Sequence, residues 1–363
     1  MNGRSVLTFD AFLLVSTIVL VVIGVLFIYS SGVTSDGDSV SREWIRQIVW
    51  AGTGIVLLLS VSAIDYRRAR DAAVYVYGAL VLTLILTLLV GRVVNGARSW
   101  LGIGQFGVQP SEFAKIGTIL LLARFLESRG DQIKRASSFL ITSLIAAIPF
   151  GLVILQPDLG TAVVFIPVFL VMAFVAGADI RHILFLVLAG GLLVVFTVLP
   201  AWEHYIYGQE VPALAVLREE RLMRLVLAGA LVILGLAITG LFTLKKTYFY
   251  WIAFVALAFA GALGGSAVAR TVLQDYQLMR LIVFMDPYVD PLGAGWNIIQ
   301  SVTAVGSGGI VGKGWLGGTQ SHFQYLPQQS TDFIFSILSE EWGFVGALAV
   351  FALFAVILTR GVI

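Results

Sequence analysis

Long apolar segments recur along the whole chain and constrain its fold more than any other feature. Runs of about 17 or more predominantly apolar residues follow one another, which is the length that a helix needs to cross the hydrocarbon layer of a membrane. Of the 363 residues, 59% are hydrophobic and only 12% are charged. A soluble domain cannot bury that much apolar surface. The chain is therefore predicted to be an all-α, polytopic transmembrane helix bundle.

The apolar runs predict about ten transmembrane helices. They span residues 11–31, 44–63, 72–91, 111–127, 138–155, 160–178, 181–200, 223–244, 247–269 and 333–358. The first run is too long for the core of a signal peptide and lacks a small-residue cleavage site followed by a soluble domain. It is therefore interpreted as a true first span, and residues 1–363 as a single integral membrane domain.

Basic residues in the short loops predict the orientation. The residues that fall on one side are Arg4, Arg67, Arg68, Arg70, Arg129, Lys134, Arg135, Arg181, Lys245, Lys246 and Arg360. Because Lys and Arg are enriched in cytoplasmic loops, this side is predicted to be cytoplasmic, with both termini inside. The opposite side carries the long connections 92–110, 201–222 and 271–331. Long loops are usually functional, so we look for the chemistry in 271–331, the predicted large extracellular loop.

Composition also excludes several classes of function. The chain contains no Cys, which excludes disulfides, thiolate metal sites and cysteine nucleophiles. Its net charge of +2 is too small to suggest a nucleic-acid partner. The segment 306–318, GSGGIVGKGWLGG, superficially suggests a phosphate loop, but it lacks the GxxxxGK[ST] spacing and no strand precedes it. A flexible external loop is the better interpretation.

Polar residues open the run 111–127, in the sequence QPSEFAKIG. Pro110 suits an early helical position, and Gln109 or Ser111 can serve the free amides at the helix start. Glu112 and Lys115 are three residues apart, hence on one face, and can neutralise each other. They form either a structural ion pair that locks two helices or a polar wall of an external cavity.

Two further motifs place polar residues at the external membrane face. The turn QPDLGT (156–161) separates two apolar runs, and Asp158 either caps the second helix of a tight hairpin or lines a wet cavity. In NGARSW (95–100), Arg98 suits a phosphate. Trp100 suits either a sugar face or an interfacial anchor.

The last apolar run opens with PQQSTDFIFSILSEEWG (327–343). Ser330 or Thr331 can cap the helix, with Asp332 in its first turn, and this account needs no function. The same position makes Asp332 a partly desolvated carboxylate that can act as the general base for an alcohol nucleophile. Glu340 and Glu341 lie deeper and need a cavity or a basic partner on a neighbouring helix. Upstream, DPYVDPLGAGWNIIQS (286–301) indicates a loop folded back on the membrane surface, with Asp286 and Asp290 starting turns.

These motifs together closely resemble the SEDS family, in detail its RodA branch rather than its FtsW branch. They are NGARSW…FGVQPSEFAK, QPDLGT, DPLGAGW…IIQSVTAVGSGGIVGKGWLGGTQ and LPQQSTDFIFSILSEEWGFVG, in the family's order, and they cover about residues 10–200 and 271–360. The resemblance implies a peptidoglycan glycosyltransferase of cell elongation that polymerises lipid II outside the cytoplasmic membrane. It implies a class B penicillin-binding protein, a transpeptidase, as partner. It also implies that Asp332 is the essential catalytic residue and that Trp100, Glu112, Lys115 and Asp158 are sensitive positions.

The chain departs from the family's pattern in two places. Residues 201–270, with two apolar runs, are interpreted as an inserted helix pair. The family also continues beyond the equivalent of Arg360 with two helices and a PLPLVSYGGS segment that is absent here, so we expect a truncated or rearranged chain whose activity is open.

The expected reaction joins the GlcNAc 4-hydroxyl of one lipid II to the MurNAc anomeric carbon of another and displaces undecaprenyl pyrophosphate. Because the donor bond is α and the product bond β, a single inverting displacement with Asp332 as base is the economical scheme. Arg98, Lys115 or Lys313 could steady the diphosphate, as could a divalent cation (Mg or Mn), although the sequence shows no dedicated metal cage. The remaining candidate substrate-binding residues are Trp100, Gln109, Ser111, Glu112, Gln156 and Asp158. The alternatives are a lipid II flippase and a non-catalytic scaffold for the partner.

Overall fold

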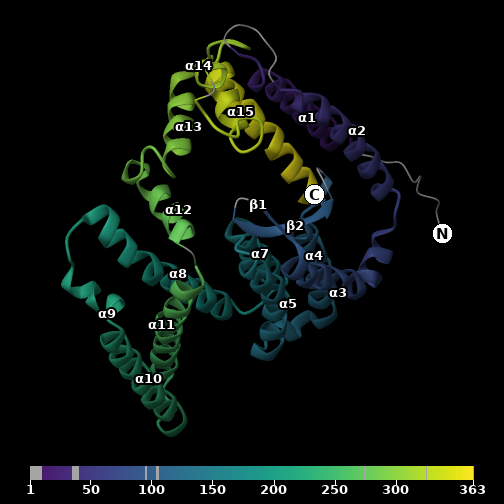
Figure 1. Ribbon diagram of the computed structural model, residues 1–363. Coiled ribbons are helices and arrows are strands. Elements are labelled where there is room, and N and C mark those ends of the chain that lie inside the picture. Colours follow the sequence, from purple (N-terminus) through teal and green to yellow (C-terminus); the bar gives the residue numbers. More distant parts are fainter. Residues whose placement is uncertain are drawn as a thin grey trace, which may run out of the picture. The chain divides into compact units, whose positions relative to one another are not determined.

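Helices occupy all ten predicted spans. The computed structural model describes residues 10–34, 41–94, 96–103, 106–273, 275–323 and 325–362. Within these residues, eight helices are long and apolar enough to cross a membrane. The span 111–127 is helix α4 (Pro110–Arg129), which carries charged residues along its length, and the span 160–178 is divided between α6 (Leu159–Val163) and α7 (Phe165–Val175). The predicted all-α, polytopic membrane architecture is confirmed (Figure 1).

Contacts divide the chain into two compact units, each described by itself. The terminal unit comprises residues 1–65 and 283–363, and the central unit comprises residues 66–282. Helix α12 (Asp275–Met285) crosses the boundary between them. The prediction of a single integral membrane domain stays a prediction.

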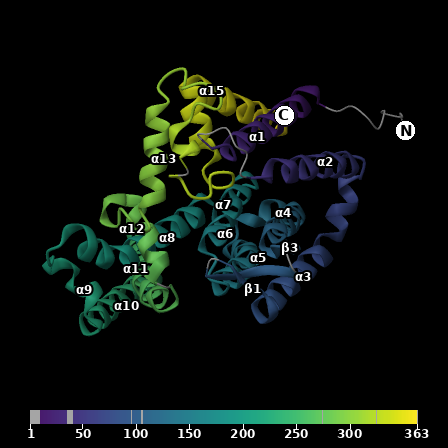
Figure 2. The ribbon, with the colours of Figure 1, turned by 45° about the horizontal axis from the view of Figure 1, so that its top comes forward.

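The terminal unit is built around the last helix. Its elements are α1 (Ala11–Ser31), α2 (Glu43–Ser62), the 3₁₀ turn η4 (Pro287–Val289), α13 (Trp296–Ser307), α14 (Thr319–His322) and α15 (Ile334–Val362). Helices α1 and α13 both pack against α15, and α1 runs beside α15 in both ribbon views (Figures 1 and 2). The apolar core between α1 and α15 consists of Phe27, Ile337, Leu338 and Val350. This packing brings the two ends of the sequence together.

The central unit contains the remaining helices and three short strands. Its further elements are α3 (Tyr66–Val90), β1 (Arg92–Val94), β2 (Ala97–Ile103), β3 (Phe106–Val108), η1 (Gly130–Lys134), α5 (Ala136–Leu155), α8 (Ile180–Trp202), η2 (Glu203–Tyr207), η3 (Pro212–Leu214), α9 (Ala215–Arg218), α10 (Glu220–Thr243) and α11 (Thr247–Val272). Helices α4, α5, α7 and α8 share one apolar core, in which Leu122, Phe139, Phe169 and Ile183 are buried. A second core, around Leu84 and Phe165, lies next to the QPDLGT turn.

The connection 92–110 contains an antiparallel sheet that the sequence analysis did not predict. The strand order is β1-β2-β3, with Arg92 opposite Trp100 and Leu101 opposite Val108. The turn between β1 and β2 includes Gly96, whose φ of 84° is a left-handed conformation that Gly adopts without a steric penalty. The sheet fixes the candidate residues Arg98 and Trp100 on β2.

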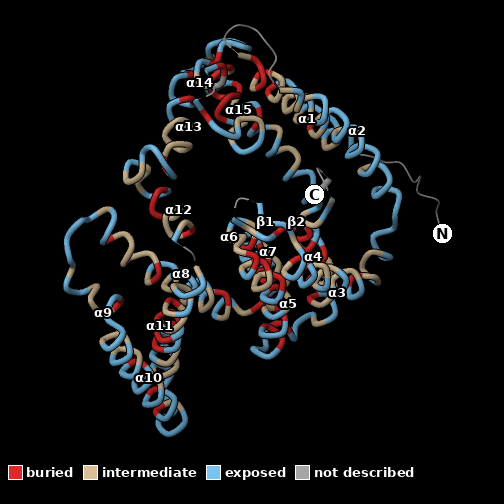
Figure 3. The backbone as a smooth tube through the Cα atoms, in the orientation of Figure 1, coloured by how far each residue is buried: buried red, intermediate tan, exposed pale blue. Residues whose placement is uncertain are grey.

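The predicted helix pair 201–270 is present as α10 and α11. Helix α11 packs against both α10 and α8, and its buried residues are mostly small: Ala256, Ala258, Ala260, Ala262, Leu263 and Ser266. Small residues allow close approach of helices in a membrane, where apolar burial alone does not drive association. Buried segments of α11 are visible in Figure 3. The pair is therefore packed on the rest of the central unit through α8.

Candidate active site

Asp332 lies in a turn immediately before α15, and its side chain is exposed. The amide of Asp332 donates a hydrogen bond to the carbonyl of Gln328 (3.1 Å), and Gln328 adopts a left-handed φ of 52°. None of the hydrogen bonds or ion pairs found among the described residues involves the Asp332 carboxylate. The carboxylate is thus held by its backbone while its oxygens stay available.

The structure corrects three expectations about this segment. Helix α15 begins at Ile334, so Asp332 precedes the helix and does not lie in its first turn. Neither neighbouring hydroxyl caps the helix, because Ser330 Oγ donates to Glu43 Oε2 of α2 and Thr331 Oγ1 donates to the Gln328 carbonyl (3.4 Å). The expected partial desolvation of Asp332 is also wrong, since the residue is exposed. The physical reason is the turn at Gln328, which delays the start of the helix.

Contacts on both sides hold this turn in place. Trp296 Nε1 at the start of α13 donates to the carbonyl of Tyr325 (2.9 Å), and Leu326 is 1% exposed. After the turn, the hydroxyls of Ser301 on α13 and Ser336 on α15 are 2.7 Å apart. Helix α13 therefore fixes the chain before and after Asp332.

Helix α15 is interrupted at Gly343, whose φ and ψ are 64° and −161°. In an unbroken helix the amides of Phe344 and Val345 would donate to the carbonyls of Glu340 and Glu341. The break leaves these four backbone groups without their helical partners, and buried backbone groups of this kind need other partners. We name the parts on either side the N-terminal half (334–342) and the C-terminal half (344–362) of α15.

The Gly-rich segment 306–318 supplies the missing partners. Its backbone hydrogen bonds to α15 are Phe344 N to Gly309 O (2.9 Å), Val345 N to Ile310 O (3.1 Å), Lys313 N to Glu340 O (3.0 Å) and Gly314 N to Glu341 O (2.9 Å). A Cβ at Gly308 would collide with the carbonyl oxygen of Ser339, so only Gly permits this approach. The segment that the sequence analysis interpreted as a flexible loop is bound into the helix break.

Glu340 is fully buried and binds both the Gly-rich segment and the two residues that follow it. Its Oε1 accepts hydrogen bonds from Lys313 Nζ (2.7 Å), from Thr319 N and Oγ1 (2.8 and 2.9 Å) and from Gln320 N (3.1 Å). Lys313 Nζ also donates to Thr319 Oγ1 (2.8 Å). The predicted basic partner for a deep acid is therefore present, but it comes from the Gly-rich segment and not from a neighbouring helix. Because Glu340 and Thr319 engage the Lys313 ammonium, a role of Lys313 on a diphosphate stays a prediction.

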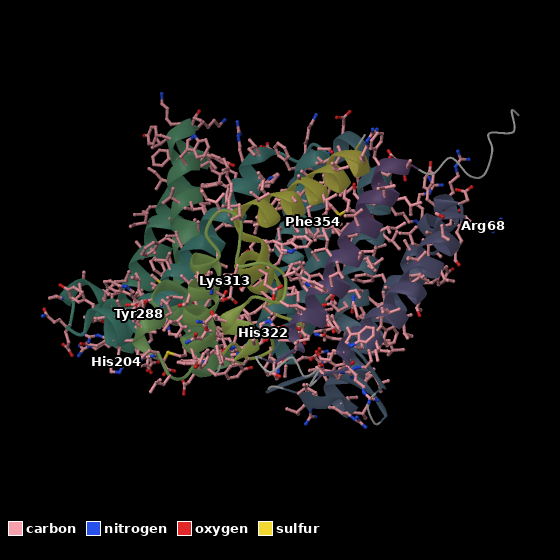
Figure 4. All side chains as sticks on the ribbon, turned by 90° about the horizontal axis from the view of Figure 1, so that it is seen from above. Arg68, His204, Tyr288, Lys313, His322 and Phe354 are labelled. Carbon is pink, nitrogen blue, oxygen red and sulfur yellow. The ribbon has the colours of Figure 1, made fainter. Side chains whose placement is uncertain are left out.

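Glu341 is also fully buried and connects α15 to α1. Its carboxylate accepts a hydrogen bond from Ser30 Oγ on α1 and another from Leu316 N (3.1 Å). His322 Nε2 on α14 is 3.8 Å from Glu341 Oε1. Figure 4 labels Lys313 and His322; the Lys313 ammonium is paired with Glu340, and His322 is near Glu341.

In the central unit, Asp158 joins two helices. Its Oδ1 accepts a hydrogen bond from Thr161 N (3.2 Å), which confirms the predicted N-cap of the helix after the turn. Its Oδ2 accepts a second bond from Gln109 Nε2 at the start of α4 (2.8 Å). Gln109 therefore binds Asp158 and does not cap α4 with its side chain. Ser111 is fully buried, and its hydroxyl has no hydrogen-bond partner in the described part of the chain.

The QPDLGT turn is bonded to three further elements. Gln156 is fully buried, and its Nε2 donates to the carbonyl of Leu84 on α3 (3.1 Å). The backbone amide of Arg98 on β2 donates to the carbonyl of Gln156 (3.0 Å). Tyr276 Oη and Gln277 Nε2 on α12 both donate to the carbonyl of Pro157 (3.1 and 3.2 Å). The polar groups of the turn are thus bonded to other parts of the protein, although only Gln156 among its residues is fully buried.

The side chains of the other candidates of the central unit have different partners. Glu112 and Lys115 form the predicted ion pair, with Lys115 Nζ 2.8 Å from Glu112 Oε2. Trp100 is 36% exposed and lies against Gly107 of β3, where a Cβ would meet its ring. The guanidinium of Arg98 is exposed and donates to the carbonyl of Leu88 (3.3 Å).

The structure thus brings together some predicted site residues and leaves others apart. Arg98, Gln109, Gln156 and Asp158 converge on the QPDLGT turn, whereas Asp332 and Lys313 belong to the terminal unit. The residues that the sequence analysis missed are Ser30, Glu43, Tyr276, Gln277, Thr319, Gln320 and His322. Each is a single polar residue whose partner is distant in sequence, so no local pattern signals it. Across the described ranges, no group of three or more His, Asp or Glu residues could hold a metal ion.

The double role of Asp158 gives a stability prediction. Replacing an N-cap Asp by Ala costs about 1 kcal/mol, and Asp158→Ala also leaves the Gln109 amide without its acceptor. We expect Asp158→Ala to lower the free energy of unfolding by about 2 kcal/mol, measured by reversible unfolding of the purified protein in detergent. Asp179→Ala is the matched control, since Asp179 caps α8 through Arg181 N (2.9 Å) in the same way and is expected to cost only about 1 kcal/mol. Equal losses in the two variants would contradict the role of Gln109.

Comparison with known proteins agrees with these features. The family model described as "Cell cycle protein" for FtsW, RodA and SpoVE matches residues 10–226 and 211–363. The peptidoglycan glycosyltransferase RodA of Treponema pallidum is 47% identical over 356 residues, which cover 98% of this chain and 82% of that protein. The stage V sporulation protein E of Bacillus subtilis is 33% identical over 359 residues, which cover 97% of this chain and 78% of that protein.

A solved structure carries the same fold. It belongs to a study of the structural coordination of polymerization and crosslinking by a peptidoglycan synthase complex, and its matching chain is 29% identical with a TM-score of 0.60. The match covers 98% of this chain and 77% of that chain. The chain belongs to the family of FtsW, RodA and SpoVE.

Proposed function

We propose that this chain is a peptidoglycan glycosyltransferase, which polymerises lipid II into glycan strands during cell elongation. The family membership and the names of its relatives support this activity. The motifs that resemble those of the family include the turn that carries Asp332. They also include helix α13, which holds that turn, and the Gly-rich segment 306–318, which is bound into the break in α15. A membrane-embedded enzyme of this kind needs no nucleotide, because the diphosphate leaving group of the donor already carries the driving energy.

The reaction would be a single displacement with Asp332 as general base. The carboxylate takes the proton of the GlcNAc 4-hydroxyl as that oxygen attacks the MurNAc anomeric carbon of the donor. The bond from that carbon to the diphosphate oxygen breaks, and undecaprenyl pyrophosphate leaves with the electron pair. Attack opposite the α-linked diphosphate gives a β-linked product. The observation that carries this role is a carboxylate with fixed backbone, exposed oxygens and no partner within the described residues.

The other proposed substrate-binding residues belong to the central unit. Arg98 has an exposed guanidinium, and the Lys115 ammonium beside Glu112 is a second cation of this unit. Either cation would stabilise the negative charge that develops on the departing diphosphate. Trp100 presents a half-exposed ring of the kind that packs on a sugar face. The residues around the QPDLGT turn, with Ser111, would support this surface from within, since Gln156 and Ser111 are fully buried.

The basic residues of the short loops support an orientation with both termini in the cytoplasm of a bacterium. Residues 271–331 and Asp332 would then face outward from the cytoplasmic membrane, surrounded by membrane lipids. The pair α10 and α11 would be an insertion that preserves this sidedness, since it adds two spans to one integral membrane domain. A class B penicillin-binding protein is the proposed partner, which the likeness to a chain of a peptidoglycan synthase complex supports.

The test is polymerisation by the purified chain together with a class B penicillin-binding protein whose transpeptidase is blocked. Labelled lipid II would be incubated with both proteins, and glycan strands would be resolved by gel electrophoresis. We expect a ladder of strands. A lipid II flippase would instead expose fluorescent lipid II across the bilayer of proteoliposomes without forming strands. A non-catalytic scaffold would bind the partner and do neither, and either result would overturn the proposed activity.

A further inference from the structure

The break in α15 separates the short N-terminal half from the rest of the helix, so the N-terminal half can tilt by itself. The N-terminal half of α15 runs from Ile334 to Trp342, and Asp332 lies two residues before its first turn. From Asp332 to Glu340 the chain rises about 12 Å at 1.5 Å per residue, if the whole stretch is counted as helical. A tilt of about 5° at the break would therefore move Asp332 by about 1 Å, so whatever fixes this tilt also fixes the catalytic turn.

The Glu340 carboxylate is the group best placed to fix the tilt. It lies in the last turn of the N-terminal half, next to the break, and it is fully buried. It accepts hydrogen bonds from Lys313 of the Gly-rich segment and from Thr319 and Gln320, which follow the segment. The Glu340 side chain thus connects Lys313, Thr319 and Gln320 to the N-terminal half of α15.

The backbone bonds of the Gly-rich segment cannot do this alone. Two of them run from the segment to the N-terminal half of α15, and two run to the C-terminal half. Each half of the helix is therefore held by only two of these backbone hydrogen bonds. Gly-rich backbone has more conformational freedom to lose than any other, so its position needs a side-chain anchor. The ion pair between Lys313 and Glu340, at 2.7 Å with the carboxylate 0% exposed, is such an anchor, beside the bond from Leu316 N to the Glu341 carboxylate (3.1 Å).

We propose that Glu340 is a positioning residue for Asp332, which acts by clamping the Gly-rich segment into the break of α15 and so setting the tilt of the N-terminal half. The Glu340 carboxylate does not touch the substrate; it sets the distance from the Asp332 carboxylate to the acceptor hydroxyl. This inference rests on the proposed polymerase activity.

The test uses Glu340→Gln in the full chain with its partner. Glutamine keeps the size and one acceptor oxygen but leaves the Lys313 ammonium, 28% exposed, without its counter-charge. We expect kcat for lipid II polymerisation to fall about 10- to 100-fold with KM unchanged, because a misplacement of about 1 Å costs up to 10²-fold. The double variant Glu340→Gln with Lys313→Met also lacks the clamp, and we expect its kcat to be no higher than that of Glu340→Gln.

Two further variants and one structural readout complete the experiment. Asp131→Asn, in the exposed pair of Asp131 and Lys134 (3.0 Å), makes the same chemical change elsewhere and is expected to leave kcat unchanged. Thr319→Val removes only one hydroxyl from the clamp and is expected to lower kcat about threefold, so it stays informative if Glu340→Gln fails to fold. Hydrogen exchange of the peptide 306–318 should accelerate in Glu340→Gln and also in the double variant.

The outcomes separate this inference from the activity on which it rests. If the unmodified chain makes no glycan strands, the proposed function fails and not the clamp. If the unmodified chain polymerises and Glu340→Gln does so equally well, the clamp is overturned. A raised KM at constant kcat would show a substrate contact, and a double variant that recovers the kcat of the unmodified chain would trace the loss to the unpaired charge of Lys313; both also overturn it.

Discussion

Replacement of Asp332 by Asn is expected to lower lipid II polymerisation about 10²- to 10⁴-fold, the range that a general base contributes. Asn keeps the shape of the side chain but cannot take the proton of the acceptor hydroxyl. Its stability should not change, because the Asp332 carboxylate has no hydrogen bond or ion pair within the described chain and the turn is held by backbone and by neighbours. The measurement is the initial rate of strand formation from labelled lipid II, with the thermal midpoint of the same preparation.

The control for charge is Asp286→Asn. Asp286 is another acid of the terminal unit, and its side chain accepts from Tyr288 N (2.9 Å), a bond that Asn can also accept. We expect this variant to polymerise at the normal rate. A rate for Asp332→Asn within threefold of the unmodified chain would remove Asp332 from the mechanism. A large fall in its thermal midpoint would instead mean that the carboxylate has a structural role after all.

The same variants discriminate between the alternative functions. A base for sugar transfer must lie where the acceptor hydroxyl can reach it, which fits the exposed Asp332. A lipid transport path would depend on charges deep in the bilayer, such as Glu340 and Glu341. Both of these acids are fully buried and hydrogen-bonded to the Gly-rich region or to α1, so their surroundings are those of a structural clamp.

The spans could be predicted from the sequence because the bilayer imposes a length and a composition on each of them. Local motifs also predicted contacts within a single helix correctly, namely the Asp158 N-cap of α6 and the ion pair of Glu112 and Lys115 in α4. The predicted span 333–358 began one residue before α15 does, and the expected position of Asp332 in the first turn was wrong. Left-handed Gln328 was the cause, and nothing in its type signals that conformation.

The break in α15 could not be predicted because its cause is distant in sequence. A Gly within an apolar run is tolerated in a helix, so Gly343 alone indicates nothing. The break exists because segment 306–318 provides partners for the four backbone groups that it frees. By contrast, the sequence does contain a local signal for the sheet formed by β1, β2 and β3. The dipeptide Asn95-Gly96 between short β-prone runs is the strongest short-range indication of a hairpin.

The Gly-rich segment should tolerate no side chain at Gly312. This residue has a φ of 80°, and a Cβ there would collide with the backbone carbonyl of Glu341, which cannot move without disturbing α15. The left-handed conformation costs a non-Gly residue about 1–2 kcal/mol, and overpacking costs about 1–3 kcal/mol more. We expect Gly312→Ala to lower the free energy of unfolding by about 2–5 kcal/mol, a large part of the total stability of a typical protein. The measurement is reversible unfolding of the purified chain in detergent.

Two other glycines of the segment separate strain from collision. Gly309 has a φ of 57° but open space around its missing Cβ, so Gly309→Ala should cost only the conformational part, about 1–2 kcal/mol. Gly306 lies in helix α13 with open space, and Gly306→Ala should be neutral or stabilise by up to about 1 kcal/mol. Gly306→Ala should therefore be the most stable of the three variants, Gly309→Ala intermediate and Gly312→Ala the least stable. If Gly312→Ala were no less stable than Gly309→Ala, the segment would not be wedged into the helix break, and the tilt of the N-terminal half of α15 would need another cause.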